Sequence, residues 1–167
     1  AFEEFKKNIR KEFWRHRDVL TSDALSPVER NQFESVCDGT AEDSVYITSI
    51  KLLSDCLSSV NKKNVIILID EYDVPLENSY FRGFYDEMVD FIRSAFESAL
   101  KTNHSLEFGI LTGCLRISKE SIFTGLNNMR VYPITESVLS QYYGFTQEEV
   151  EKIAKEYDLT ERISEMK

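Results

Sequence analysis

Residues 65–71 read VIILIDE, an apolar run that ends in two adjacent carboxylates. Five consecutive apolar residues, most of them β-branched, predict a strand that is buried on both faces, as in parallel sheets covered by helices. The ligand crevice of such a sheet lies at the carboxyl ends of its strands, which is where Asp70 and Glu71 stand. Many buried strands end in an acid because loops are polar. This motif alone is therefore weak evidence for a nucleotide site, and the neighbouring elements must support it.

Apolar residues at helical spacing predict several helices around this strand. Ser26 and Thr146 each precede a glutamate by three residues, which is the pattern of a capping box at a helix start. The expected helices cover residues 2–13, 26–39, 50–60, 84–100 and 147–157, and the expected strands cover residues 65–70, 106–112 and 130–133.

The second strand ends in Thr112 and Gly113. Because a long helix separates this strand from the first, we expect a β-α-β unit with a parallel crossover. Thr112 would then stand where nucleotide hydrolases of this topology need a polar residue that senses the terminal phosphate, and Arg116 would face the same crevice as a charge stabiliser. Two plainer interpretations stay open, in which Thr112 is only a turn residue and Arg116 only a surface charge at a helix start.

Composition limits the classes of function. The net charge of −9 argues against a nonspecific grip on nucleic acid, so no direct nucleic-acid binding is expected. Cys37, Cys56 and Cys114 are odd in number and lack C-x-x-C spacing, so neither a disulfide framework nor a zinc site is predicted and a reducing cytoplasm fits best. No signal peptide or membrane-length apolar run is present, and we expect a soluble protein.

Long collinear segments carry a family resemblance. They read VIILIDEYDVPL at 65–76, GFYDEMVDFIRSAFESALK at 83–101, LTGCLRISKESIFTGLNN at 111–128 and YYGFTQEEV at 142–150. These segments resemble the predicted AAA-ATPase-like family of bacterial proteins. The resemblance implies an α/β fold, a partial P-loop NTPase-like (RecA/AAA-like) parallel sheet flanked by helices, and hydrolysis of ATP with Mg²⁺. It also implies that a C-terminal nuclease-like domain can follow in the parent protein.

The resemblance implies a role for several residues by their position in the motifs. Asp70 would be the Walker B acid that supports Mg²⁺, and Glu71 would be the catalytic base that polarises the attacking water. Thr112 falls at the sensor position, Asp73 on the cofactor-binding side and Arg116 among the catalytic residues. The matching motifs also hold residues without an assigned role, namely Lys119, Ser121, Asn127 and Asn128.

The chain departs from the family pattern in one respect. A P-loop needs G-x-x-x-x-G-K-[ST], and none of the six glycines is followed by lysine. We therefore expect one domain over 1–167 that is a fragment, with a helical region at about 1–61, a Walker B and sensor core at about 62–135 and a helical start at about 136–167. Without the phosphate cradle, this chain should bind ATP weakly or not at all and should not turn it over. Missing strands would leave an exposed sheet edge through which two copies could pair.

Two other hypotheses stay open. The chain could be a degenerate ATPase fold that acts as a protein-interaction module, or Asp70, Glu71 and Asp73 could bind a divalent ion without nucleotide.

In the loop after the first strand, Pro75 is expected to prevent the immediate continuation of a helix.

Overall fold

The computed structural model describes residues 2–114, 122–126, 128–133, 135–142 and 144–165. The chain forms two compact units, residues 1–127 and 128–167, and each is considered by itself. Four residues of the predicted motifs, Arg116, Lys119, Ser121 and Asn127, lie outside the described residues, so the role of Arg116 stays a prediction. The organisation of residues 1–167 as a single domain also stays a prediction.

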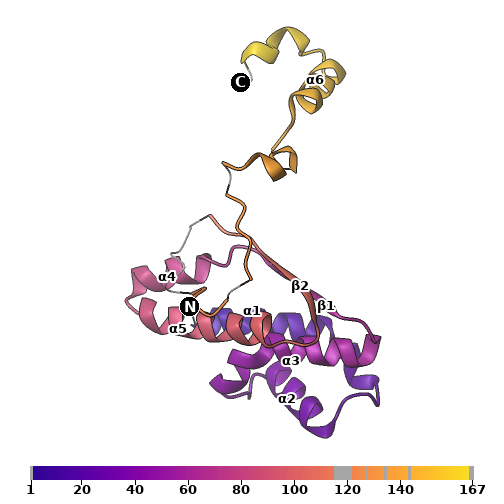
Figure 1. Cartoon of the computed structure of the whole chain (residues 1–167), viewed down its shortest axis with the longest axis vertical. Coiled ribbons are helices and arrows are strands. Elements are labelled where there is room, and N and C mark those ends of the chain that lie inside the picture. The colour runs from indigo at the N-terminus through magenta and orange to yellow at the C-terminus, as the bar shows by residue number, and fades with distance from the viewer. Residues whose placement is uncertain (1, 115–121, 127, 134, 143, 166–167) are drawn as a thin grey trace. The chain divides into compact units, whose positions relative to one another are not determined.

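The first unit begins with helices. They are α1 (Phe2–Arg15), the short η1 (Arg17–Thr21), α2 (Pro27–Asp38) and α3 (Asp43–Asn61), all labelled or coloured in Figure 1. The predicted capping box starts α2, because the Ser26 hydroxyl accepts a hydrogen bond from the Glu29 N–H and the Glu29 carboxylate accepts one from the Ser26 N–H. Gly39 ends α2 at φ 75°, a left-handed conformation that glycine adopts without a Cβ clash. The first three predicted helices are confirmed.

The sheet of this unit has two parallel strands, β1 (Val65–Ile69) and β2 (Leu106–Leu111). The connection between them runs through α4 (Val74–Arg82), α5 (Tyr85–Phe96) and a π-helical turn, η2 (Glu97–Lys101). Gly109 lies opposite Ile67 in the register, and a Cβ atom on Gly109 would come within 2.8 Å of the Leu100 side chain. The end of the connecting helix therefore packs directly on β2, and the predicted parallel β-α-β unit is confirmed.

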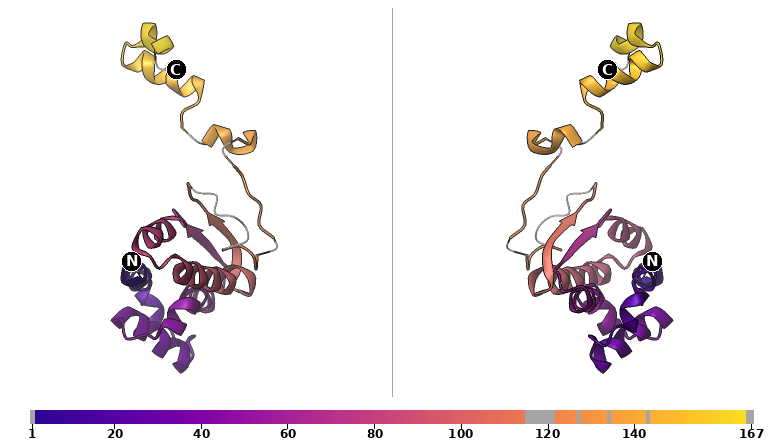
Figure 2. Two further views of the ribbon diagram at one scale, coloured as in Figure 1. Left: turned by 90° about the vertical axis from the view of Figure 1, so that its left-hand side faces the viewer. Right: turned by 90° about the vertical axis from the view of Figure 1, so that its right-hand side faces the viewer.

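One face of the sheet is covered by helices and the other is open. Figure 2 shows α3 and α5 on one side of the two strands. Ile67 is buried on that side, whereas Ile66 and Leu68 are 50% and 71% exposed. Phe108 and Ile110, their partners in the register, are 48% and 49% exposed. The prediction that β1 is buried on both faces is wrong, because the described helices pack against one face of the sheet.

Two local predictions are corrected. Pro75 lies in the first turn of α4, where proline is favoured because the amide it lacks would have no partner within the helix. It therefore helps to begin a helix rather than to prevent one. Residues 130–133 form no strand, since Pro133 lacks an N–H donor and no strand is described in residues 128–165 with which this run could pair.

The core of the first unit lies between its helices. The aromatic rings of Phe13 and Phe33 pack with their centroids 4.7 Å apart. Met88 and Ile92 confirm the apolar stripe predicted for α5, because both are fully buried. None of the described helices is long and apolar enough to cross a membrane.

The second unit consists of short helices, η3 (Ser137–Tyr142), α6 (Gln147–Glu156) and η4 (Thr160–Glu165). The predicted capping box of α6 is confirmed. The Glu149 carboxylate accepts hydrogen bonds of 2.8 Å from both the N–H and the hydroxyl of Thr146. These bonds favour the ionised form and hold the pKa of Glu149 below its ordinary value.

Candidate functional site

Polar side chains meet where β1 and β2 end. The Thr112 hydroxyl donates a hydrogen bond to the Asp70 carboxylate, and both residues are exposed to solvent. Carboxylate and hydroxyl oxygens are the hard ligands, direct or through water, that Mg²⁺ prefers. The Asp70–Thr112 pair therefore presents oxygen atoms of this kind to solvent at the ends of the two strands.

Just after β1, the chain holds one residue more than regular pairing with β2 needs, and this extra residue is Glu71. The Thr112 N–H donates to the Ile69 carbonyl at 2.9 Å, and the Tyr72 N–H donates to the Thr112 carbonyl at 3.0 Å. In a regular parallel ladder, the second donor would stand two residues after Ile69 rather than three. Glu71 takes up the additional residue in a left-handed conformation, with φ 54°, as in a β-bulge.

This backbone conformation is costly for a residue with a Cβ atom, by about 1–2 kcal/mol. The Glu71 N–H points to the Thr112 hydroxyl at 3.4 Å, and the Glu71 side chain is exposed. Strained residues of this kind persist where the surrounding structure holds them, and they are concentrated at functional sites. The bulge therefore places an exposed carboxylate beside the Asp70–Thr112 pair.

Asp73 has a different environment from Asp70. It is 4% exposed, and its Oδ2 atom accepts a hydrogen bond of 2.8 Å from the Cys114 N–H. A Cβ atom on Gly113 would lie 2.9 Å from Asp73 Oδ1 and 2.7 Å from the Tyr72 ring. The loop after β2 thus lies directly against the loop after β1, with Asp73 as the link between them.

The sequence gives little indication of this link between the loops. Its one signal was Gly113 directly after a strand, since glycine in that position often marks a close approach of two backbones. Nothing local indicated that the partner of Asp73 would be the Cys114 amide, because the two residues are 41 positions apart.

The three-carboxylate metal site is not formed. Within residues 2–114 and the other described ranges, no group of three or more His, Cys, Asp or Glu side chains is placed to hold a metal ion. The hypothesis that Asp70, Glu71 and Asp73 together bind a metal without nucleotide is therefore wrong. The reason is that Asp73 is buried against the second loop, whereas the other two carboxylates face solvent.

A family model described as Predicted AAA-ATPase matches residues 2–123, which include both strand ends. The chain belongs to the predicted AAA-ATPase family. The mixed helical structure with its parallel β1–β2 pair agrees with an α/β protein of this family. No solved structure matches the chain.

One curated relative of this AAA-ATPase family member is described as "Uncharacterized protein in vnfD 5'region", from Azotobacter chroococcum mcd 1. It is 29% identical over 92 residues. The aligned stretch is 54% of this chain but 18% of the relative, so the chain spans less than a fifth of that protein's length.

Proposed function

We propose that this chain supplies the acidic and phosphate-sensing part of an ATPase site, and that the whole protein hydrolyses ATP with Mg²⁺ on a P-loop NTPase-like sheet. The observation that carries the proposal is the hydrogen bond from the Thr112 hydroxyl to the Asp70 carboxylate. It joins the ends of two adjacent parallel strands, which is where open α/β sheets bind their ligands. The site lies inside the matched family region.

Each residue has a distinct part in this proposal. Asp70 would hold Mg²⁺ through its carboxylate, and the bound ion would neutralise charge on the phosphates. Glu71, exposed on its bulge, would orient a water molecule and accept its proton. Thr112 would turn its hydroxyl from Asp70 to a phosphate oxygen. Asp73 would keep the two loops in register beneath them.

The phosphate-binding half would come from elsewhere in the whole protein. Residues 1–167 contain no G-x-x-x-x-G-K-[ST] sequence, and the exposed carboxylates at the strand ends repel an anionic nucleotide. A hydrated Mg²⁺ ion held by one carboxylate is a weak anchor. We therefore expect no micromolar binding of Mg²⁺-ATP to this chain alone by calorimetry. Arg116 stays a predicted charge stabiliser outside the described residues.

The test compares two glutamates in the protein encoded by the complete reading frame. Glu71→Gln should lower ATP turnover at least about a hundredfold, which is the usual effect of losing a general base, while nucleotide binding is retained. Glu77→Gln is the matched control, because Glu77 is an exposed glutamate on α4 and its loss should leave turnover unchanged. Equal turnover in the wild type and in both variants would disprove the assignment.

The open face of the sheet favours a second candidate function, that of a protein-interaction module. Four apolar side chains, Ile66, Leu68, Phe108 and Ile110, lie on that face. If this function holds, Leu68→Lys should abolish the cellular function of the whole protein and Glu71→Gln should leave it intact. The opposite pattern supports the ATPase proposal. Pairing of two copies through a free edge of β1 or β2 would appear as a dimer in light scattering.

A further inference from the structure

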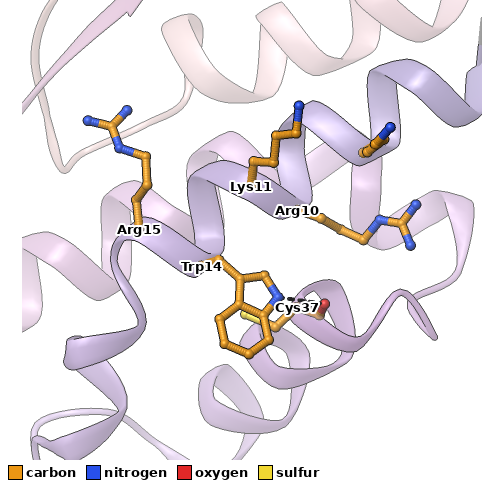
Figure 3. Close-up of a pocket in the computed structure, with 6 residues that line it drawn as sticks. Arg10, Lys11, Trp14, Arg15 and Cys37 are labelled. Carbon is orange, nitrogen blue, oxygen red and sulfur yellow. Dashed lines mark hydrogen bonds between the residues drawn. The ribbon is translucent and has the colours of Figure 1, made fainter.

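The first helix of this acidic chain and the two residues after it carry a local excess of positive charge. The chain has a net charge of −9, yet residues 1–17 hold six of its 20 Lys and Arg residues and three of its 29 Asp and Glu residues. A shallow surface pocket lies on this helix, as Figure 3 shows. Its lining residues are Lys7, Arg10, Lys11, Trp14, Arg15 and Cys37. We call them the α1 surface.

Trp14 is held in one orientation at the α1 surface. Its Nε1–H donates a hydrogen bond of 3.1 Å to the Cys37 carbonyl, which Figure 3 shows beside the indole ring. The Arg17 guanidinium lies 4.3 Å from the ring centroid, within the range of a cation–π interaction. The side chain nevertheless stays 49% exposed. Since its only donor is already used, the exposed part of Trp14 can offer a partner stacking or apolar contact, but no hydrogen bond.

The cations of the α1 surface are weakly neutralised. Lys7 pairs with Glu4 at 3.8 Å and Arg15 with Glu12 at 2.7 Å, both on the exposed surface of the helix. Exposed pairs of this kind contribute little to stability and can be exchanged for another anion. Arg10 and Lys11 form no ion pair with any residue that the structure describes. The row from Lys7 to Arg15 follows the helix for about 12 Å.

We propose that the α1 surface binds single-stranded nucleic acid, with backbone phosphates on its Lys and Arg side chains and a base stacked on Trp14. Charge complementarity requires an anionic partner, and the exposed aromatic surface without a free donor favours one that also carries flat rings. An acidic peptide would satisfy the charges but not the indole. The remainder of the chain is strongly acidic, so the contact should be short and sensitive to salt.

The net charge of the whole chain does not decide what binds at the α1 surface. A net charge of −9 describes the chain as a whole, but salt-screened interactions act over about 10 Å. A partner at α1 therefore responds mainly to the local excess of cations. For the same reason, we expect strong binding only when the bound nucleic-acid segment does not extend over the acidic remainder of the chain.

Trp14 provides a direct readout, because it is the only tryptophan among the 167 residues. Oligothymidine should quench its fluorescence at low salt, and the quenching should disappear as salt is raised. Poly-glutamate, used as the acidic-peptide probe under the same conditions, should leave the emission unchanged. Absence of quenching by oligothymidine, or equal quenching by poly-glutamate, would overturn the proposal.

Two double variants separate local from overall charge. Arg10→Gln/Lys11→Gln removes two cations from the α1 surface, and Lys152→Gln/Lys155→Gln removes two exposed cations from α6. The first should reduce the slope of log Kobs against log salt by about 1.4, the value for two lost single-strand phosphate contacts. The control should keep the wild-type slope. Equal slopes in the two variants would contradict a defined site.

A third variant tests stacking without the tryptophan signal. Trp14→Ala should weaken binding of a fluorescein-labelled oligothymidine about tenfold to a hundredfold, measured by anisotropy. Trp14→Phe keeps a stackable ring and should retain most of the affinity, although it also lacks the bond to the Cys37 carbonyl. Circular dichroism confirms that both variants fold. If a folded Trp14→Ala variant binds the oligonucleotide with unchanged affinity, no base stacks on Trp14.

Discussion

The helical core and the strand-end loops of the first unit are built on opposite principles. In the core, apolar side chains such as Phe33 and Met88 are fully buried, and their removal from water stabilises the fold. In the loops, a strained Glu71 and a buried Asp73 stand beside exposed polar groups. The contrast indicates that the core supplies the stability that holds the loops in a shape they would not adopt alone.

The largest expected contrast is in thiol reactivity. Cys56 lies in the core, where burial raises its pKa from 9.0 to about 12, whereas Cys114 is exposed in the loop after β2. The change in pKa lowers the thiolate fraction of Cys56 about a thousandfold. A disulfide reagent at neutral pH should therefore label Cys114 rapidly and Cys56 at least about a thousandfold more slowly. Simultaneous labelling of both thiols would remove the distinction between the two regions.

The same burial predicts how stability depends on pH. The unfolded thiol of Cys56 ionises near its ordinary pKa, but the folded thiol stays neutral up to about pH 12. The contribution of this site is thus complete below pH 9 and is lost as the pH rises from 9 toward 12. Urea unfolding of the wild type and of Cys56→Ala across this range should show a smaller alkaline loss in the variant. Parallel curves would contradict the prediction.

Truncation in the core should have the largest effect on stability itself. Phe33→Ala removes a ring that packs 4.7 Å from that of Phe13, and we expect a loss of about 3–5 kcal/mol in the free energy of unfolding. Phe81→Ala is the control, because Phe81 is 78% exposed, and its cost should stay within about 0.5 kcal/mol. Chemical denaturation measures both. Similar losses in the two variants would show that the core boundary is elsewhere.

A smaller loss is expected from the loops. Asp73→Ala leaves the Cys114 N–H without its acceptor, which should cost about 1–3 kcal/mol. Asp73→Asn keeps an acceptor oxygen and should lose less. The alanine variant should also speed the labelling of Cys114, since its loop is released from the loop after β1. If both variants are as stable as the wild type and their Cys114 is labelled at the wild-type rate, Asp73 does not link the loops.

The smallest effect has the opposite sign. Glu71→Gly relieves a left-handed residue at φ 54°, and we expect a gain of about 0.5–1 kcal/mol after the greater flexibility of unfolded glycine is counted. Glu71→Ala keeps a Cβ atom and should show no gain. In the whole protein, both variants should lose the proposed ATP turnover. A more stable and fully active Glu71→Gly variant would mean that the strain has no functional purpose.

Prediction from the sequence succeeded where the determining residues are neighbours. The capping boxes at Ser26 and Thr146 were predicted and are formed, because each depends on residues only three positions apart. The opposite error at Pro75 has the same local origin, since proline both interrupts helices and begins them, and its position relative to the helix start decides which.

The sequence by itself determined the α/β class, the principal helices, the two parallel strands and membership of the predicted AAA-ATPase family. Periodicity, capping and motif order are properties of short segments, so they can be recognised before the chain folds. Only the tertiary structure decided that one sheet face is open, that Glu71 forms a bulge, and that Asp73 binds the Cys114 amide while Asp70 meets Thr112. Those contacts join residues more than 40 positions apart, and such pairings arise only when the strands come together.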